Sequence, residues 1–229
     1  MTGHVPVLVG EVLEALGPAT GRTVIDATVG GGGHAYRILE TSPPSGRLVG
    51  VDRDGAALLV ARETLAPFAG RFTLLRGNFA DLSEVASAHL PASGILLDLG
   101  LSSLQLQDEG RGFSFLSGGP LDMRMDPSLE TTAADLVNRL PEAELARILF
   151  EYGEERRSRA IARRIVRARA EKPLKSASEL ADIILGVAPR RGRIHPATRS
   201  FQALRIAVNG ELENLDRALG ALAGWLEPG

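Results

Sequence analysis

The segment Val24–Asp54 constrains the fold most, because it has the strand–turn–helix–strand pattern of a βαβ unit. An apolar run over residues 24–28 leads into four consecutive glycines, Gly30 to Gly33, and residues 35–39 then predict a helix. A second apolar run over residues 48–52 ends in an acid. Glycine allows positive φ angles and a close approach of the backbone to a ligand. The pattern predicts a nucleotide-cofactor site on a parallel α/β sheet.

Two acids, one on each side of the glycine loop, bear on the choice of cofactor. Gly30-x-Gly32-x-x-Ala35 fits the dinucleotide fingerprint, so an NAD enzyme remains an alternative. Asp26, however, precedes the loop and would face the negatively charged pyrophosphate of a dinucleotide. S-adenosylmethionine (SAM) has no phosphate; its ammonium group suits Asp26 and its ribose hydroxyls suit Asp52. We therefore expect SAM.

The first part of the chain alternates strand and helix signals, as expected for a parallel sheet. Helices are predicted over residues 9–16, 56–65 and 83–89, and further strands over 72–75 and 94–100. Ligands of open α/β sheets bind beyond the carboxyl ends of the strands. Residues at four such ends should therefore meet in one crevice: Asp26, Asp52, Phe79 and Asp98.

The pattern changes after the fourth predicted strand. Residues 101–128 show no clear periodicity and predict a long loop, in which interleaved Phe and Met argue against disorder. Only helices are predicted beyond it, with caps at Thr132-x-x-Asp135 and Ser176-x-x-Glu179. Apolar residues at steps of three or four predict one long amphipathic helix over 201–222. A helical block therefore follows the sheet.

Composition excludes several kinds of site. The chain of 229 residues has no cysteine, which rules out disulfides and a thiolate nucleophile. Its four histidines lack the spacing of a metal site, so we expect no protein-bound metal. Neither a membrane-spanning apolar run nor a secretory signal is visible in the sequence. The sequence predicts a cytoplasmic enzyme that binds no membrane.

Charge is unevenly distributed along a nearly neutral chain. Residues 156–205 hold 12 Arg and 2 Lys against three acids, a net charge of +11. One strongly basic segment in such a chain indicates a polyanionic partner. The alternative is a helical face that the arginines merely keep solvated.

Eight motifs appear in a characteristic order along nearly the whole chain, and they closely resemble the bacterial RsmH (MraW) family. That family methylates the N4 amino group of a cytidine in small-subunit (16S) ribosomal RNA. The sixth and eighth motifs are specific to it, unlike the glycine loop. In order, the motifs are His4-x-Pro-Val-Leu8, Asp26–His34, Val51–Asp54, Leu97–Ser103, Arg111–Phe115, Pro120–Asp126, Tyr152–Arg156 and His195–Gln202.

The resemblance implies a methyltransferase with SAM as cofactor and a helical substrate domain inserted in a Rossmann-like sheet. We expect the methyltransferase domain over residues 1–108 and 206–229, and the inserted loop-plus-helical domain over 109–205. Relatives continue past the last residue of this chain, so we expect its final C-terminal strands to be missing, which leaves its own activity open. The expected partner is small-subunit ribosomal RNA, either naked or in an assembled subunit, and a homodimer is left open.

The resemblance also implies individual site residues, carried over by position. The loop contacts to the cofactor are Gly32, Gly33 and His34, Asp52 binds the ribose, and Phe79 flanks the adenine. The remaining cofactor contacts are Asp98 and Gln105, and the glycine-loop pattern itself adds Asp26 and Gly30. Contacts to RNA are expected from aromatic, histidine and arginine side chains: Phe113, Phe115, Arg124, Tyr152, Arg163, Arg164, His195 and Arg199.

The reaction requires mainly that the protein align the two reactants and accept a proton. The amino nitrogen of cytosine is a poor nucleophile, so the enzyme must position it against the methyl group and accept its proton. Asp98 either orients the amino group and accepts its proton, or only binds the cofactor. A ring-carbon target would call for a cysteine nucleophile, so a nitrogen or oxygen target is favoured. The alternatives are an NAD-dependent oxidoreductase and a non-catalytic RNA-binding assembly factor.

Overall fold

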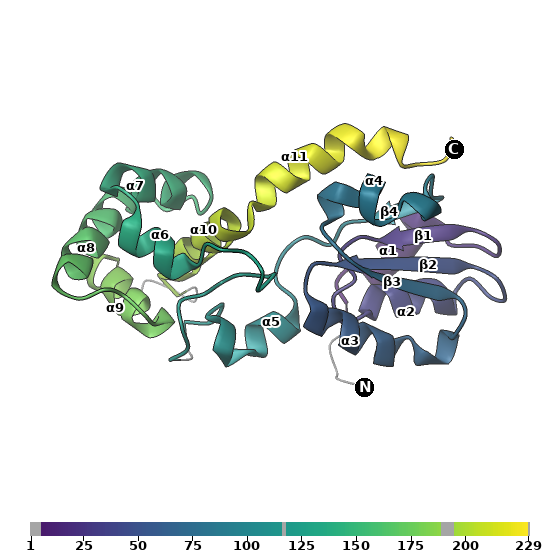
Figure 1. The fold of residues 1–229 in the computed structure, drawn as a ribbon, viewed down its shortest axis with the longest axis horizontal. Helices are drawn as coiled ribbons and strands as arrows, with labels where there is room; N and C mark the ends of the chain where they lie inside the picture. The colour runs from purple at the N-terminus through teal and green to yellow at the C-terminus, as the bar shows by residue number, and fades with distance from the viewer. Residues whose placement is uncertain (1–5, 116–117, 189–194, 229) are drawn as a thin grey trace. The chain divides into compact units, whose positions relative to one another are not determined.

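The computed structural model describes residues 6–115, 118–188 and 195–228 of the chain. The chain forms two compact units. The first unit runs to Leu104 and resumes at Leu212, and the second comprises Gln105–Glu211 (Figure 1). None of the described helices is long and apolar enough to cross a membrane.

The first unit is an α/β structure built on a parallel sheet (Figure 1). The sheet has the order β3-β2-β1-β4, so the chain winds outward from β1 and then returns to the other side of it. This reversal places a topological switch point between β1 and β4, where such sheets bind their ligands. The prediction of a Rossmann-like α/β sheet is confirmed. In chain order the elements are α1 (Val9–Leu16), β1 (Thr23–Asp26), α2 (Gly33–Glu40), β2 (Arg47–Asp52), α3 (Gly55–Thr64), β3 (Phe72–Arg76), α4 (Leu82–Val85), β4 (Gly94–Leu96) and α11 (Glu211–Ala221).

Alternate residues of the central strands face two separate apolar cores. Val24 and Leu48 pack with α2 and α3, and Leu13 of α1 joins this core. Ile25 and Val49 face the opposite way, toward a core that contains Leu82 of α4 and Ala218 of α11. Figure 1 shows α2 and α3 on one side of the sheet and α4 and α11 on the other. Both faces of the parallel sheet are therefore covered, which explains the near-continuous apolar runs of its strands.

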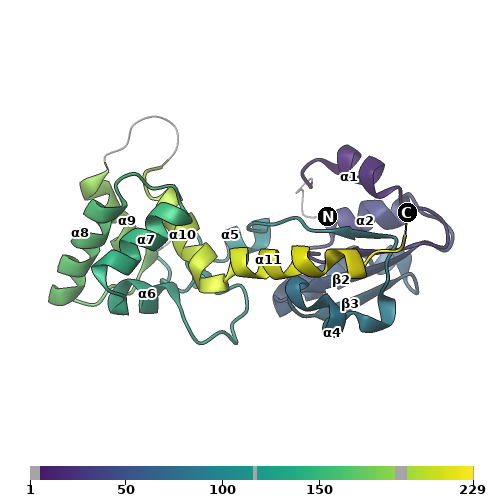
Figure 2. The ribbon, with the colours of Figure 1, turned by 90° about the horizontal axis from the view of Figure 1, so that it is seen from above.

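The second unit consists of helices and the loop that precedes them (Figure 2). The capping boxes expected at Thr132 and Ser176 are both present and begin α6 and α9. Each box satisfies backbone N–H groups that the first turn of a helix leaves free. The helices of this unit are α5 (Ser103–Gln107), α6 (Ala133–Arg139), α7 (Glu142–Glu151), α8 (Ser158–Glu171), α9 (Ala177–Val187) and α10 (Thr198–Asn209), where α5 starts at the end of the first unit.

Three expectations about the secondary structure were wrong in detail. The fourth strand ends at Leu96, so Asp98 lies two residues beyond it. The loop over 101–128 contains the short helix α5. The single long helix expected over 201–222 is two helices, because Gly210 adopts a left-handed conformation at φ 57° that ends α10. Periodicity alone did not reveal this break.

Candidate functional site

Three carboxylates lie near the carboxyl ends of β1, β2 and β4. Asp26 ends β1 and is buried, Asp52 ends β2, and Asp98 follows β4 with its side chain 55% exposed. The carboxylates of Asp52 and Asp98 both act on the ionisation of Asp26. The predicted convergence of these acids at one edge of the sheet is therefore present.

The glycine loop lies between the first two carboxylates and is tied to one of them. The backbone N–H of Gly30 donates to Oδ2 of Asp52 at 2.9 Å. Gly30 and Gly32 have φ angles of 51° and 86°, which L side chains rarely adopt. A Cβ atom at Gly32 would also lie 3.3 Å from the backbone of Ala61. Backbone conformation therefore favours glycine at both positions, and space is also tight at Gly32.

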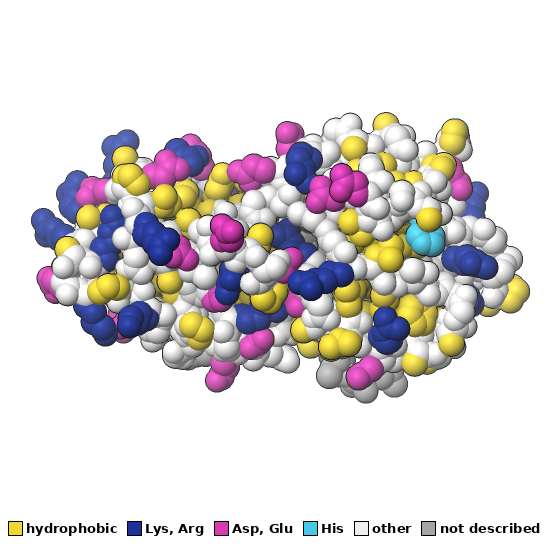
Figure 3. Space-filling model, in the orientation of Figure 1, with side chains coloured by type: hydrophobic (Ala, Val, Ile, Leu, Met, Phe, Trp, Pro, Cys, Tyr) yellow, Lys and Arg dark blue, Asp and Glu magenta, His cyan; other side chains and the backbone are white. Residues whose placement is uncertain are grey.

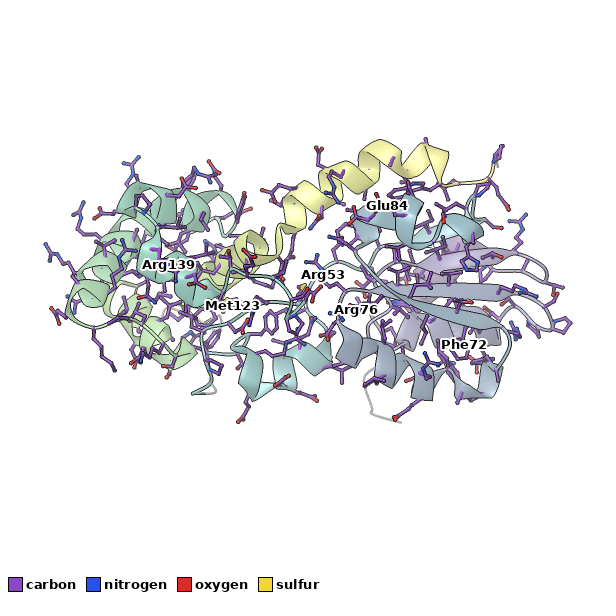
Figure 4. The ribbon with its side chains drawn as sticks, viewed as in Figure 1. Arg53, Phe72, Arg76, Glu84, Met123 and Arg139 are labelled. Atoms are coloured by element: carbon purple, nitrogen blue, oxygen red, sulfur yellow. The ribbon has the colours of Figure 1, made fainter. Side chains whose placement is uncertain are left out.

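Asp52 uses one lone pair on each of its oxygens within the protein. Oδ1 accepts the backbone N–H of Asp54 at 2.9 Å, and Oδ2 accepts that of Gly30. A carboxylate has about four acceptor positions, so both oxygens retain capacity for a diol. Burial raises the pKa of Asp52, and these two N–H groups oppose the rise. Figure 4 labels Arg53 and Arg76, which bring positive charge to the same edge of the sheet.

Asp26 is the most deeply buried of the three acids, at 1% exposure. Burial raises its pKa from 3.8 to about 7, the backbone N–H of Thr28 opposes this, and the charges of Asp52 and Asp98 add to it. A cationic ligand in the crevice would favour the ionised form. Asp26 therefore holds a negative charge most easily when a positive group is nearby.

The raised pKa predicts how the stability of the ligand-free protein depends on pH. The folded state holds the Asp26 proton up to about pH 7, whereas the unfolded chain releases it near 3.8, so stability falls as pH rises between these values. One pKa unit corresponds to about 1.4 kcal/mol. The change in the free energy of unfolding that Asp26→Asn causes, variant minus wild type, should therefore be more favourable at pH 8 than at pH 4 by up to about 4 kcal/mol. Urea unfolding of both proteins at these two pH values tests this; parallel changes would contradict it.

The position of Asp98 is fixed by a contact that could not be predicted from the sequence. Its backbone N–H donates to Oγ1 of Thr28 at 2.7 Å, which links the end of β4 to the start of the glycine loop. The contact spans the switch point between β1 and β4. Thr28 is therefore a site residue that our sequence reasoning missed, because the two partners are 70 positions apart.

His34 lies in the first turn of α2 and is 8% exposed. Its Nε2 is 2.9 Å from the carbonyl oxygen of Val7, and its Nδ1 is 3.6 Å from Oδ2 of Asp98. A Cβ atom at Gly33 would lie only 2.6 Å from Pro6. The segment before α1 therefore packs directly against the glycine loop, and the first motif of the chain acts in the same place as the second. His4 lies outside the described residues.

Phe79 begins the short 3-10 helix Phe79–Asp81 after β3 and is 6% exposed. It belongs to the core that also contains Val51 and Leu82. Its ring is thus largely covered by protein, and its contact with adenine stays a prediction. Gln105 belongs to the second unit, and its contact with the cofactor also stays a prediction.

In the second unit, the segment Pro120–Asp126 is held by its own side chains. Four N–H groups of Arg124 donate within the segment or just beyond it, to both oxygens of Asp122 and to the carbonyls of Pro127 and Leu129. A guanidinium has five N–H groups, so one is left for a phosphate. The structure thus gives Arg124 a role in shaping this loop, and its contact with RNA stays a prediction.

Asn209 at the end of α10 anchors the same loop. Its side chain accepts the backbone N–H of Met125 at 2.8 Å and donates to the carbonyl of Met123 at 2.8 Å. Met123, labelled in Figure 4, is fully buried and has a φ angle of 62°, a strained conformation for a non-glycine residue. These bonds hold the strained backbone in place, and they could not be predicted from the sequence.

The aromatic candidates for base stacking differ in exposure. Phe113 is buried at 5% exposure, so it offers no open face for a base. Phe115 is partly exposed and stacks on His195 with ring centroids 4.3 Å apart. Tyr152 is also partly exposed and follows α7. Phe115, His195 and Tyr152 thus remain the candidates for stacking.

Arginines of the basic segment gather on one side of α8. The opposite side buries Ile161, Ala162 and Ile165 in the interior of the second unit. Arg163 lies 3.6 Å from Glu142, whereas Arg199 donates to the carbonyl of Glu154 at 3.2 Å. Figure 3 shows basic side chains over the region of this helix. The exposed side carries Arg159, Arg163, Arg164 and Arg167, and the exposed Arg156 lies just before the helix. The arginines at 190, 191 and 193 lie outside the described residues.

Comparison with known families decides which class of enzyme this site belongs to. The model of the MraW methylase family matches residues 1–229. This chain belongs to the MraW methylase family. Proteins named ribosomal RNA small subunit methyltransferase H are similar to it over 99% of its length. Those of Geobacter sulfurreducens and Geobacter sp. (strain M21) are 54% and 51% identical and are covered over 74% of their lengths. That of Granulibacter bethesdensis is 52% identical and covered over 68%.

Methylases of this family take their methyl group from SAM, and the residues at the carboxyl edge fit that cofactor. Asp52 keeps free acceptor positions for a ribose diol, and the buried Asp26 favours a cationic ligand. The loop glycines at positions 30 and 32 adopt positive φ angles, which let the backbone of the loop approach a ligand closely. Within the described residues no group of three or more His, Cys, Asp or Glu side chains is arranged to hold a metal ion.

Proposed function

We propose that this MraW-family methylase transfers the methyl group of SAM to the N4 amino group of a cytidine in small-subunit ribosomal RNA. The observation that carries the proposal is the exposed carboxylate of Asp98, held by Thr28 beside a glycine loop that is itself held by Asp52. Bound SAM supplies an electrophilic methyl group. The protein residues orient the amino group and accept the proton that it releases.

Asp98 suits both tasks. A carboxylate accepts hydrogen bonds from an amino group and so aims the nitrogen lone pair at the methyl carbon. As the nitrogen–carbon bond forms, positive charge develops on the nitrogen, and a nearby negative charge stabilises it. One amino proton then leaves to the carboxylate. The exposure of Asp98 leaves it accessible to a base from solution, unlike the buried Asp26.

The direct experiment is transfer of a labelled methyl group from SAM to RNA. We expect label in small-subunit ribosomal RNA, either naked or in the assembled subunit, and none in large-subunit RNA used as the control. Label that favours large-subunit RNA would contradict the proposed substrate. Comparing the label in naked RNA with that in the assembled subunit also shows which of the two is the better substrate.

We further propose that the exposed side of α8 binds RNA phosphates. Among the described residues no ion pair or hydrogen bond engages the side chains of Arg156, Arg159, Arg164 and Arg167, so their donors are available. Residues 159, 163 and 167 are one turn apart, about 6 Å at 1.5 Å per residue. A row of exposed guanidinium groups, in which Arg163 alone is paired, with Glu142, among the described residues, favours a polyanion with regularly spaced charges.

Reversing Arg163 and Arg164 to Glu should weaken RNA binding at least tenfold and lower the slope of log Kd against log salt by about two, one per lost phosphate contact. SAM binding should not change. Arg37→Glu with Arg62→Glu, on exposed positions of α2 and α3, is the control with the same change in net charge. Equal weakening in both pairs would indicate a general effect of charge and would contradict a surface on α8. Filter binding over a range of salt concentrations gives all of these values.

A further inference from the structure

His34 and Asp98, both expected to contact the cofactor, also form a pair with each other. Nδ1 of the imidazole is 3.6 Å from Oδ2 of the carboxylate. The side chain of His34 is 9% exposed and that of Asp98 is 55% exposed. The pair therefore connects a buried imidazole with a carboxylate that an incoming substrate can reach.

A hydrogen bond on the far side of the imidazole fixes its tautomer. Nε2 lies 2.9 Å from the carbonyl oxygen of Val7. A carbonyl oxygen only accepts hydrogen bonds, so Nε2 carries the ring hydrogen. In the neutral ring Nδ1 is then unprotonated, and its lone pair faces the carboxylate of Asp98. Neither group has a hydrogen to offer the other, so the pair is suited to receive one proton.

We propose that His34 is a positioning residue for proton removal, which acts through Asp98; this rests on the proposed function. In the reaction the amino nitrogen forms a bond to the methyl carbon while the carbon–sulfur bond breaks, its electron pair remaining on sulfur. One N–H proton passes to Asp98, and the electron pair of that bond stays on nitrogen. The proton then moves from Asp98 to Nδ1 of His34, which leaves an imidazolium beside a carboxylate.

The second transfer moves the proton from a carboxylate to an imidazole. As a residue type, an imidazole is a stronger base than an aspartate carboxylate. The other acids at this edge of the sheet are Asp26 at the end of β1, whose ionisation Asp98 affects, and Asp52 at the end of β2. The acids of α1, Glu11 and Glu14, are exposed to solvent.

Two variants of His34 separate this role from a structural one. In His34→Gln the side-chain amide nitrogen can take the place of Nε2 and still donate to Val7, but nothing accepts a proton from Asp98. In His34→Asn the amide lies near the position of Nδ1, and the contact with Val7 is lost. A purely structural role predicts that Gln behaves as wild type and only Asn is impaired. A proton acceptor predicts that both are impaired.

Single-turnover methyl transfer at saturating SAM should be at least tenfold slower in His34→Gln at pH 7. The acid limb of its rate profile should also move from the range typical of imidazole toward that typical of a carboxyl group. His89→Gln, at a histidine of the 3-10 helix Ser87–His89, is the control and should match wild type. A wild-type rate and profile in His34→Gln would show that the proton passes from Asp98 directly to water, and would overturn the proposal.

A readout without substrate or cofactor tests the tautomer itself. Nitrogen chemical shifts of the His34 ring, assigned by comparison with His34→Gln, should show a protonated Nε2 and an unprotonated Nδ1 in the neutral ring. The opposite tautomer would overturn the proposal even if methyl transfer were normal. Failure of wild type to methylate small-subunit RNA would instead contradict the proposed function, so the two failures are distinguishable.

Discussion

Asp98→Asn is expected to slow methyl transfer by about 10²- to 10⁴-fold, the usual contribution of a general base, while the Kd for SAM stays within a few-fold of wild type. Asparagine keeps the size of the side chain and the backbone N–H that donates to Thr28 at 2.7 Å, so the position of residue 98 should not change. It removes the negative charge and most of the basicity. Single-turnover rates and calorimetric titration with SAM give the two quantities separately.

The same experiment decides between the two roles that the sequence left open for Asp98. If Asp98 only binds the cofactor, the variant should have a raised Kd for SAM and a normal rate at saturation. If it accepts the proton, the rate falls at saturation. Thr28→Val is a useful companion, because it removes the acceptor of the Asp98 N–H and leaves the carboxylate intact. We expect its rate to lie between those of wild type and Asp98→Asn.

Asp52→Ala should weaken SAM binding by about 1–3 kcal/mol, or about 5- to 150-fold, because buried hydrogen-bond partners are left unsatisfied. Two effects combine: the ribose hydroxyls lose their acceptor, and the N–H of Gly30 loses the 2.9 Å bond that holds the glycine loop. Asp52→Asn is the matched variant, since its amide oxygen can still accept from Gly30. It should bind SAM more tightly than Asp52→Ala and more weakly than wild type. Unchanged affinity in both variants would remove Asp52 from the site.

Local signals in the sequence predicted much of the first unit. The bounds of α1 agree with the expected helix over 9–16, and the two capping boxes lie where Thr132 and Ser176 placed them. Alternation of strand and helix signals was enough to predict a parallel sheet with acids at its carboxyl edge. These features succeed because each depends on residues within a few positions of one another.

The features that the sequence did not reveal depend on distant partners or on backbone conformation. The Thr28–Asp98 contact spans 70 positions, and that between His34 and Val7 spans 27. Arg124 was expected to contact RNA, but four of its five N–H donors bind Asp122 and nearby carbonyls, which the sequence did not reveal. Gly210 interrupts an apolar pattern that continues across it. Residue type indicates what a side chain can do, whereas the fold decides which partner it meets.

The position of the methyl group in the product shows which atom of the RNA receives it. Small-subunit RNA treated with the protein and SAM can be digested to nucleosides and analysed by mass spectrometry against authentic methylated cytidines. We expect N4-methylcytidine, formed about 10²- to 10⁴-fold more slowly by Asp98→Asn, because a carboxylate that accepts an amino proton serves an exocyclic nitrogen. Methylation at C5 of the base or at a ribose 2′-hydroxyl would contradict it.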